Sequence, residues 1–217
     1  SPANFIPIAE DTGTIHQIGD WVFSQAAAQA KICQTVTKRK FQISVNKSPV
    51  QFLGERGDQH LWLDQINKAG IEGDDIVIEI TEGILVNNDI RVTQSLMQYR
   101  DAKVQVAIDD FGTGYSSLAH LKRFPIDVLK IDQSFVREMN EATASRAIVE
   151  AIITMASALG LSVVADHPDN VRALDAANAG GRALAVLIDV DPGNHRTGVA
   201  SPEAAVALAA AIDAAAN

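Results

Sequence analysis

The stretch VQVAIDDFGTGYSSL, residues 104–118, decides the fold of this chain. Its apolar residues alternate up to Ile108 as in a strand of a buried sheet, and Asp109 and Asp110 follow where the glycines of the FGTG segment end that strand. In parallel α/β folds this end of a strand carries the ligand site, and two adjacent carboxylates offer hard oxygen ligands to Mg²⁺, Mn²⁺ or Ca²⁺. A structural alternative is that Asp110 caps the following turn and Asp109 pairs with a lysine.

Composition narrows the class of protein. The chain has 217 residues, 27 acidic against 18 basic side chains and a net charge of −9, which argues against binding a nucleic acid polymer. A length of this order suits a single domain, residues 1–217, with a sizeable core. Cys33 is the only cysteine, no apolar run reaches the length of a membrane span, and the N-terminus lacks the pattern of a signal peptide. We therefore expect a cytoplasmic protein without membrane contact.

Strand patterns and helix patterns alternate along the whole chain. Residues 1–11 are expected to connect into a first helix, and each predicted strand is followed by a helical pattern after a short link. This succession predicts an α/β fold with a parallel sheet, a (β/α)-barrel of the TIM-barrel type. About six strands fall short of the eight that close such a barrel, so we expect an incomplete barrel or one closed by self-association through an open sheet edge. The expected strands are residues 41–45, 75–82, 104–108, 126–132, 161–166 and 183–191.

Polar side chains stand at the ends of several of these strands. Asn46 follows the first strand, where on its own it is an ordinary turn residue. Glu79 and Glu82 flank the end of the second, and an acidic side chain that points inward there needs a metal ion or another cation to offset its desolvation. Lys130, near the end of the fourth strand, is expected to face carboxylates on neighbouring strands.

The segment DDFGTGYSSLAHLKRFPIDVLKID, residues 109–132, closely resembles the signature of the EAL family of bacterial cyclic di-GMP phosphodiesterases. The segments FIPIAEDTGTI, SVNKSPVQF, IEITE and GLSVVA resemble other blocks of that family, so the resemblance covers about residues 1–165. It implies hydrolysis of one phosphodiester of cyclic di-GMP with the help of Mg²⁺ or Mn²⁺ ions. It also implies that Lys130 orients or polarises the attacking water and that Glu82 holds the loop after Asp110. The implied metal ligands are Asn46, Glu79, Asp109 and Asp110.

The chain departs from the EAL pattern in two places. The Glu-Ala-Leu segment that names the family, which supplies a metal ligand, is not found in this chain. The family continues its VVA block with Glu-Gly-Val-Glu, whereas this chain continues with Asp166-His167-Pro168-Asp169. Asp166 would then stand in for a catalytic glutamate with a side chain one methylene shorter, and a displacement of about 1 Å costs on the order of a hundredfold in rate.

Residues 163–217 resemble a second family, the D-threonine aldolase-like barrels of the alanine racemase type, which bind pyridoxal phosphate. The segment with the Schiff-base lysine of that family is not found, so we do not expect pyridoxal phosphate to bind. The chain therefore resembles a chimera, with an EAL-like part at 1–165 and a second barrel fragment at 166–217. A designed or selected chimera and a natural recombinant are the two interpretations.

Three functions follow as alternatives. The first is a chimeric TIM-barrel-type scaffold, derived from an EAL phosphodiesterase, without efficient catalysis. The second is residual metal-dependent hydrolysis of cyclic di-GMP by Lys130, Asp166 and Glu82 around the metal ligands. The third is a catalytically inactive EAL-type signalling module that binds the nucleotide or a partner protein.

Overall fold

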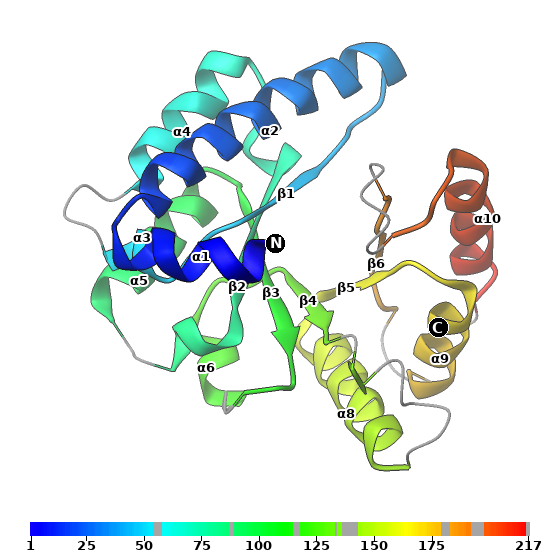
Figure 1. The fold of residues 1–217 in the computed structure, drawn as a ribbon. Helices are drawn as coiled ribbons and strands as arrows, with labels where there is room; N and C mark the ends of the chain where they lie inside the picture. The colour runs from blue at the N-terminus through cyan, green and yellow to red at the C-terminus, as the bar shows by residue number, and fades with distance from the viewer. Residues whose placement is uncertain are drawn as a thin grey trace. The chain divides into compact units, whose positions relative to one another are not determined.

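The computed structural model describes residues 1–53, 58–86, 89–114, 118–132, 134–135, 143–178, 183–191 and 198–215 (Figure 1). The chain divides into two compact units: residues 1–108 with 114–126 form the first unit, and residues 109–113 with 127–217 form the second. The elements are α1 (Pro2–Asp11), α2 (Ile15–Thr37), β1 (Ile43–Asn46), α3 (Val50–Leu53), α4 (Asp58–Ala69), η1 (Gly73–Asp75), β2 (Ile76–Thr81), η2 (Glu82–Leu85), α5 (Ile90–Asp101), β3 (Gln105–Phe111), α6 (Leu118–Arg123), β4 (Val128–Ile131), α8 (Thr143–Leu159), β5 (Ser162–Ala165), α9 (Pro168–Ala177), β6 (Val186–Ile188) and α10 (Pro202–Asp213).

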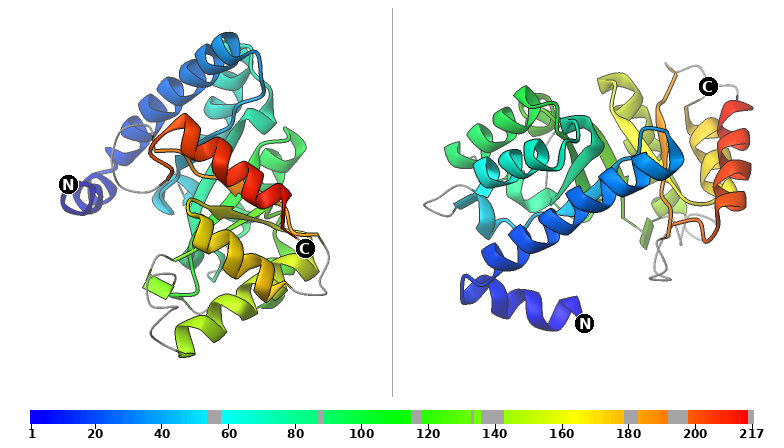
Figure 2. Two further views of the ribbon diagram at one scale, coloured as in Figure 1. Left: turned by 90° about the vertical axis from the view of Figure 1, so that its right-hand side faces the viewer. Right: turned by 90° about the horizontal axis from the view of Figure 1, so that it is seen from above.

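The first unit is built on β1, β2 and the beginning of β3. The strand β2 is buried from Ile76 to Ile80, as expected for a parallel strand that is covered on both faces. The long helix α2 lies beside α4 and packs on β1, which Figure 2 shows from two further sides. Phe23 of α2 and Trp62 of α4, both fully buried, stack with their ring centroids 4.4 Å apart.

The second unit contains the end of β3 and the strands β4, β5 and β6. Strands β4 and β5 are parallel, as are β5 and β6. Helix α8 packs on β4 and β5. Helix α9 contacts both α8 and α10. The last two helices begin as their sequences predict, because each has proline in its first turn and a side-chain cap. His167 accepts a hydrogen bond from the backbone of Asp169, and Ser201 accepts one from the backbone of Ala204.

The predicted fold class is confirmed: the protein is an α/β protein of the TIM-barrel-like kind with six parallel strands. The strands are hydrogen-bonded in the order of the chain, β1-β2-β3-β4-β5-β6, which is the order that successive right-handed strand-helix units produce. The expectation of a single domain over residues 1–217, with two parts that meet at residues 165/166, remains a prediction. Among the residues that the structure describes, no helix combines the length and the apolar character that a membrane crossing needs.

One expected element was wrong. Residues 1–11, predicted to be a connection, form the helix α1, and the chain changes direction only at Gly13, where φ is +71°. Pro2 stands in the first turn, where a missing N–H costs no intrahelical hydrogen bond. Contact with α2 and the burial of Ala9 then stabilise a helix that contains a second proline, Pro7.

Candidate functional site

The end of β3 and the end of β4 bring acidic side chains and one lysine together in the second unit. Nζ of Lys130 lies 3.4 Å from Oδ1 of Asp109, and both side chains are about a quarter exposed. The backbone N–H of Asp132 donates to the carbonyl of Phe111 over 3.3 Å, which ties the exit of β4 to the end of β3. The expectation that Lys130 faces a carboxylate of a neighbouring strand is thus confirmed. The same ion pair also fits the structural alternative, in which Asp109 pairs with a lysine. We call Asp109, Asp110, Lys130 and Asp132 the acidic cluster.

Two carboxyls of the acidic cluster, those of Asp110 and Asp132, have pKa values shifted in opposite directions. Burial, the negative charges of Asp109 and Asp132, and a hydrogen bond to Asp132 raise the pKa of Asp110, against the opposing effect of Lys130. Hydrogen bonds from the hydroxyl and the backbone N–H of Ser134 lower the pKa of Asp132. Asp110 and Asp132 thus share a hydrogen bond, which raises the pKa of Asp110 and lowers that of Asp132. A site with this surplus of negative charge favours a cation.

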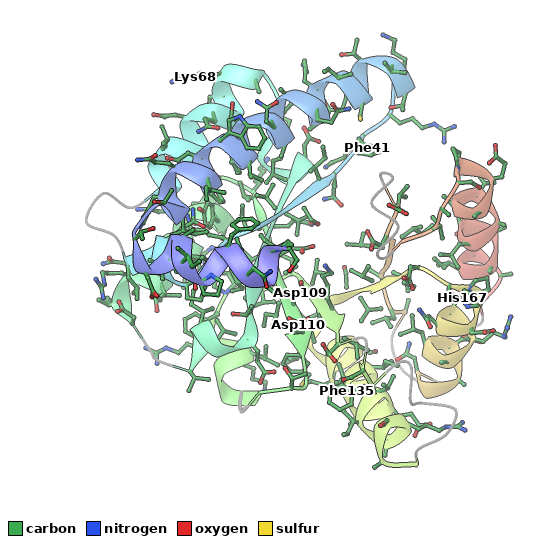
Figure 3. All side chains as sticks on the ribbon, viewed as in Figure 1. Phe41, Lys68, Asp109, Asp110, Phe135 and His167 are labelled. Atoms are coloured by element: carbon green, nitrogen blue, oxygen red, sulfur yellow. The ribbon has the colours of Figure 1, made fainter. Side chains whose placement is uncertain are left out.

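The backbone at Asp110 is strained. Its φ of +52° lies in the left-handed region, which few residues other than glycine adopt and which costs about 1–3 kcal/mol. Thr113 stabilises the turn, since its hydroxyl donates to the carbonyl of Asp110 over 2.9 Å. Gly112 has a φ of +105°, and a Cβ there would lie 3.0 Å from the ring of Phe135. Figure 3 shows Asp109 and Asp110 at the end of β3. The left-handed backbone of Asp110 and the hydroxyl of Thr113 therefore both shape the described part of this turn.

Glu82 binds the loop that follows Asp110. Its carboxylate is buried and accepts a hydrogen bond from the backbone N–H of Gly114 over 3.1 Å. A Cβ on Gly114 would lie 2.9 Å from both Cδ and Oε1 of Glu82, so the backbone passes directly over the carboxylate. Glu82 therefore contacts the loop after Asp110 through the backbone of Gly114, and its catalytic role remains a prediction.

Asn46 and Glu79 are brought together in the first unit. They are register partners on the parallel strands, Asn46 as the last residue of β1 and Glu79 two residues before the end of β2, and the N–H of Lys47 donates to the carbonyl of Glu79 over 2.8 Å. Asn46 is exposed, whereas Glu79 is 6% exposed. Two oxygen-bearing side chains therefore stand opposite each other on neighbouring strands, and their role as metal ligands remains a prediction.

Asp166 has other partners than the acidic cluster. It follows β5, and its two carboxylate oxygens accept from Nδ2 of Asn170 over 2.8 Å and from the backbone N–H of Gly198 over 3.3 Å. Gly198 has a φ of +94°, and a Cβ there would lie 2.5 Å from the backbone nitrogen of Asp191. The contacts of Asp166 thus tie the start of α9 to the segment that precedes α10.

The chemistry of these residues fits a hard divalent cation. Their donors are carboxylate and amide oxygens, and the surplus negative charge of the acidic cluster is what a bound cation would offset. Within the described ranges, no three His, Cys, Asp or Glu side chains form a group that could hold a metal ion. The predicted ligands come from both units, so the ligand set as a whole remains a prediction.

Sequence reasoning assigned no role to Asp132, which the structure places in the acidic cluster. A signal was available, because Lys130 and Asp132 are two residues apart at the end of a strand, where alternate side chains share a face. The hydrogen-bonding partner Asp110 lies on the preceding strand and could not be read from this spacing.

The chain is similar in sequence to known proteins. The family model described as EAL domain matches residues 1–184 of the chain, beyond the limit near residue 165 that the sequence suggested. The bifunctional diguanylate cyclase/cyclic di-GMP phosphodiesterase MucR of Pseudomonas aeruginosa is 36% identical over 166 residues, which cover 76% of this chain and 24% of MucR. The chain spans between 21% and 24% of the lengths of this and two other curated relatives.

Solved structures are similar as well. The PaMucR phosphodiesterase in complex with c-di-GMP has a TM-score of 0.70 and 33% identity, with 82% of this chain and 78% of that chain covered. A manganese and cyclic di-GMP complex of Klebsiella pneumoniae BlrP1 has a TM-score of 0.62 and 29% identity, with 70% of this chain and 38% of that chain covered.

Proposed function

Because the chain belongs to the EAL domain family, we propose that it binds cyclic di-GMP with the help of a divalent cation and hydrolyses it slowly. The observation that carries this proposal is the acidic cluster, in which Lys130 pairs with Asp109 and Asp110 bonds to Asp132 at the ends of β3 and β4. Two similar proteins of known structure were solved with cyclic di-GMP, one of them with manganese.

We assign one role in this proposal to each of the predicted site residues. Asn46, Glu79, Asp109 and Asp110 would hold Mg²⁺ or Mn²⁺, which when bound supplies Lewis-acid activation of water and offsets phosphate charge. Lys130 orients the attacking water and Glu82 holds the loop after Asp110 through Gly114. Pyridoxal phosphate has no part in the proposal.

Slow hydrolysis is proposed because of Asp166. In the EAL pattern a glutamate stands at this position, and the aspartate is one methylene shorter. Its carboxylate is moreover bound to Asn170 and Gly198. A catalytic carboxylate displaced by about 1 Å costs on the order of a hundredfold in rate.

The experiment is a calorimetric titration of the full chain with cyclic di-GMP in Mn²⁺ or Mg²⁺, followed by chromatography of the same mixture. We expect binding that needs the metal and slow formation of the linear dinucleotide. Asp109→Asn should abolish both. Asp101→Asn is the matched control, since Asp101 is an exposed aspartate that pairs with Arg100 at the end of α5.

The outcomes separate the alternatives. Binding without product after prolonged incubation would favour the inactive signalling module. A cooperatively folded chain that binds no nucleotide with either metal would refute the proposal and leave a scaffold without this chemistry.

The chimera stays a hypothesis about the end of the chain. The EAL family match runs to residue 184, past the junction expected at 165/166, and nothing in the comparisons supports the second barrel fragment. We also propose self-association: β1 and β6 end the strand order, so among the described strands each has one neighbour. Sedimentation at increasing concentration tests it, and a monomer throughout would contradict it.

A further inference from the structure

Lys47 follows Asn46 directly and turns away from it. Asn46 is exposed while Lys47 is 2% exposed, as the alternation of side chains at a strand end requires. The N–H of Lys47 donates to the carbonyl of Glu79, so this residue continues the β1–β2 pairing one step past Asn46. The backbone of Lys47 and that of Asn46 are therefore both fixed by pairing with β2.

The Lys47 ammonium lies among three aromatic rings of the first unit. Its Nζ is 4.1 Å from the ring centroid of Trp62, 5.0 Å from that of Phe52 and 5.7 Å from that of Tyr99. All three rings are at most 1% exposed. A cation within about 6 Å of ring faces is attracted to them, more strongly when water is excluded. We call Phe52, Trp62 and Tyr99 the aromatic box.

The aromatic box is itself held firmly. The indole N–H of Trp62 donates to Asp20 over 2.8 Å, which polarises the ring toward a more negative face, and Phe23 stacks on the same ring. The chain after Lys47 is anchored too, since the N–H of Ser48 donates to the buried Gln51 over 3.0 Å. The β1 end thus has a fixed cation on one side and an exposed amide on the other.

From this arrangement we propose that Lys47 is a positioning residue, which through the aromatic box sets the orientation of Asn46 for a divalent cation. The proposal rests on the proposed function as far as the cation is concerned. Outer partners that orient metal ligands commonly change metal affinity by 10–100-fold when they are replaced. Lys47 would act in this way without touching the metal or the nucleotide.

The test compares Lys47→Met with Lys68→Met. Methionine keeps a long apolar side chain in the aromatic box but removes the charge, whereas Lys68 is an exposed lysine near the end of α4 (Figure 3). Two readouts are taken: the ¹⁵N side-chain amide resonance of Asn46, identified by its loss in Asn46→Asp, and the affinity for Mn²⁺ from the paramagnetic resonance signal of the free ion. Thermal unfolding is recorded for every variant.

We expect Lys47→Met to keep its thermal midpoint, to move the Asn46 resonance and to weaken Mn²⁺ binding by about tenfold. Lys68→Met should change neither readout. An unmoved Asn46 resonance with unchanged Mn²⁺ affinity in Lys47→Met would overturn the proposal. If the unaltered protein binds no Mn²⁺, the proposed function fails, and the Asn46 resonance alone decides about Lys47.

A second variant covers the case in which Lys47→Met does not fold. Trp62→Phe keeps an aromatic ring in the box but weakens its attraction for a cation and removes the hydrogen bond to Asp20. It should move the Asn46 resonance in the same way, and an unmoved resonance would overturn the proposal.

Discussion

Replacing Gly114 by alanine tests the contact that holds the loop after the two aspartates. A Cβ on Gly114 would lie 2.9 Å from Cδ and 2.9 Å from Oε1 of the buried Glu82, well inside ordinary contact distance. The carboxylate has to move, which breaks the 3.1 Å hydrogen bond from the Gly114 N–H. Loss of a hydrogen bond to a charged group costs about 1.5–3 kcal/mol and overpacking adds about 1–3 kcal/mol.

The opposing effect is smaller. Replacing glycine by alanine lowers the entropy of the unfolded chain and stabilises a compatible site by about 0.4–1 kcal/mol. The net expectation is a destabilisation of about 3 kcal/mol, or about 6–12 °C in the thermal midpoint of a protein of this size. Gly83→Ala is the matched control, because a Cβ there meets no atom within 4 Å.

The assay is urea unfolding followed by circular dichroism, together with hydrolysis of cyclic di-GMP in Mn²⁺. We expect Gly114→Ala to lose stability and about a hundredfold in hydrolysis, while Gly83→Ala changes stability by less than about 1 kcal/mol. Glu82→Ala should add little to Gly114→Ala, since both break the same contact. Equal stability of Gly114→Ala and Gly83→Ala would refute the view that Glu82 holds this loop.

Three further predictions concern pH and packing. The raised pKa of Asp110 means that the folded state binds more protons than the unfolded state above the ordinary value of 3.8, so stability falls as pH rises through that window. Asp110→Asn should remove this slope in urea unfolding between about pH 4 and pH 7, and a slope equal to that of the unaltered chain would contradict the assignment. The pKa of Asp89 is lowered to about 2 by Arg91, so its contribution to stability is present above 3.8 and is lost as pH falls toward 2. Carboxyl resonances titrated in Arg91→Ala should show the pKa of Asp89 returning toward 3.8, and an unchanged value would exclude Arg91 as the cause. Gly19→Ala places a Cβ 2.1 Å from Nε2 of the buried Gln51 and should destabilise by about 1–3 kcal/mol in denaturant unfolding. Gln51→Ala should recover part of that loss when it is combined with Gly19→Ala, and strict additivity of the two would contradict the predicted clash.

Much of the fold could be predicted because its signals are local. The glycine at 112 predicted the end of β3, although the strand runs past Ile108 to Phe111 and so contains Asp109 and Asp110. Glycines at 70 and 160 predicted the ends of α4 and α8, and both have positive φ. The prediction failed at residues 1–11, where contact with α2 outweighs the low helix preference of two prolines. The candidate site was predicted in part: Asp109 and Lys130 do meet, but no rule for a single strand indicates that Asp132 bonds to Asp110.

The sequence by itself determined that six strands form, their approximate places and which carboxylates stand near their ends, because backbone hydrogen bonding and the burial of alternate side chains act over a few residues. Only the tertiary structure decided the partners. Asp166 bonds to Asn170 and Gly198, Glu82 to Gly114, and Lys47 enters a box of rings contributed by α3, α4 and α5. Apart from the contact between Asp166 and Asn170, which are four residues apart, these pairings join residues distant in the chain, and their geometry depends on how helices pack against the sheet.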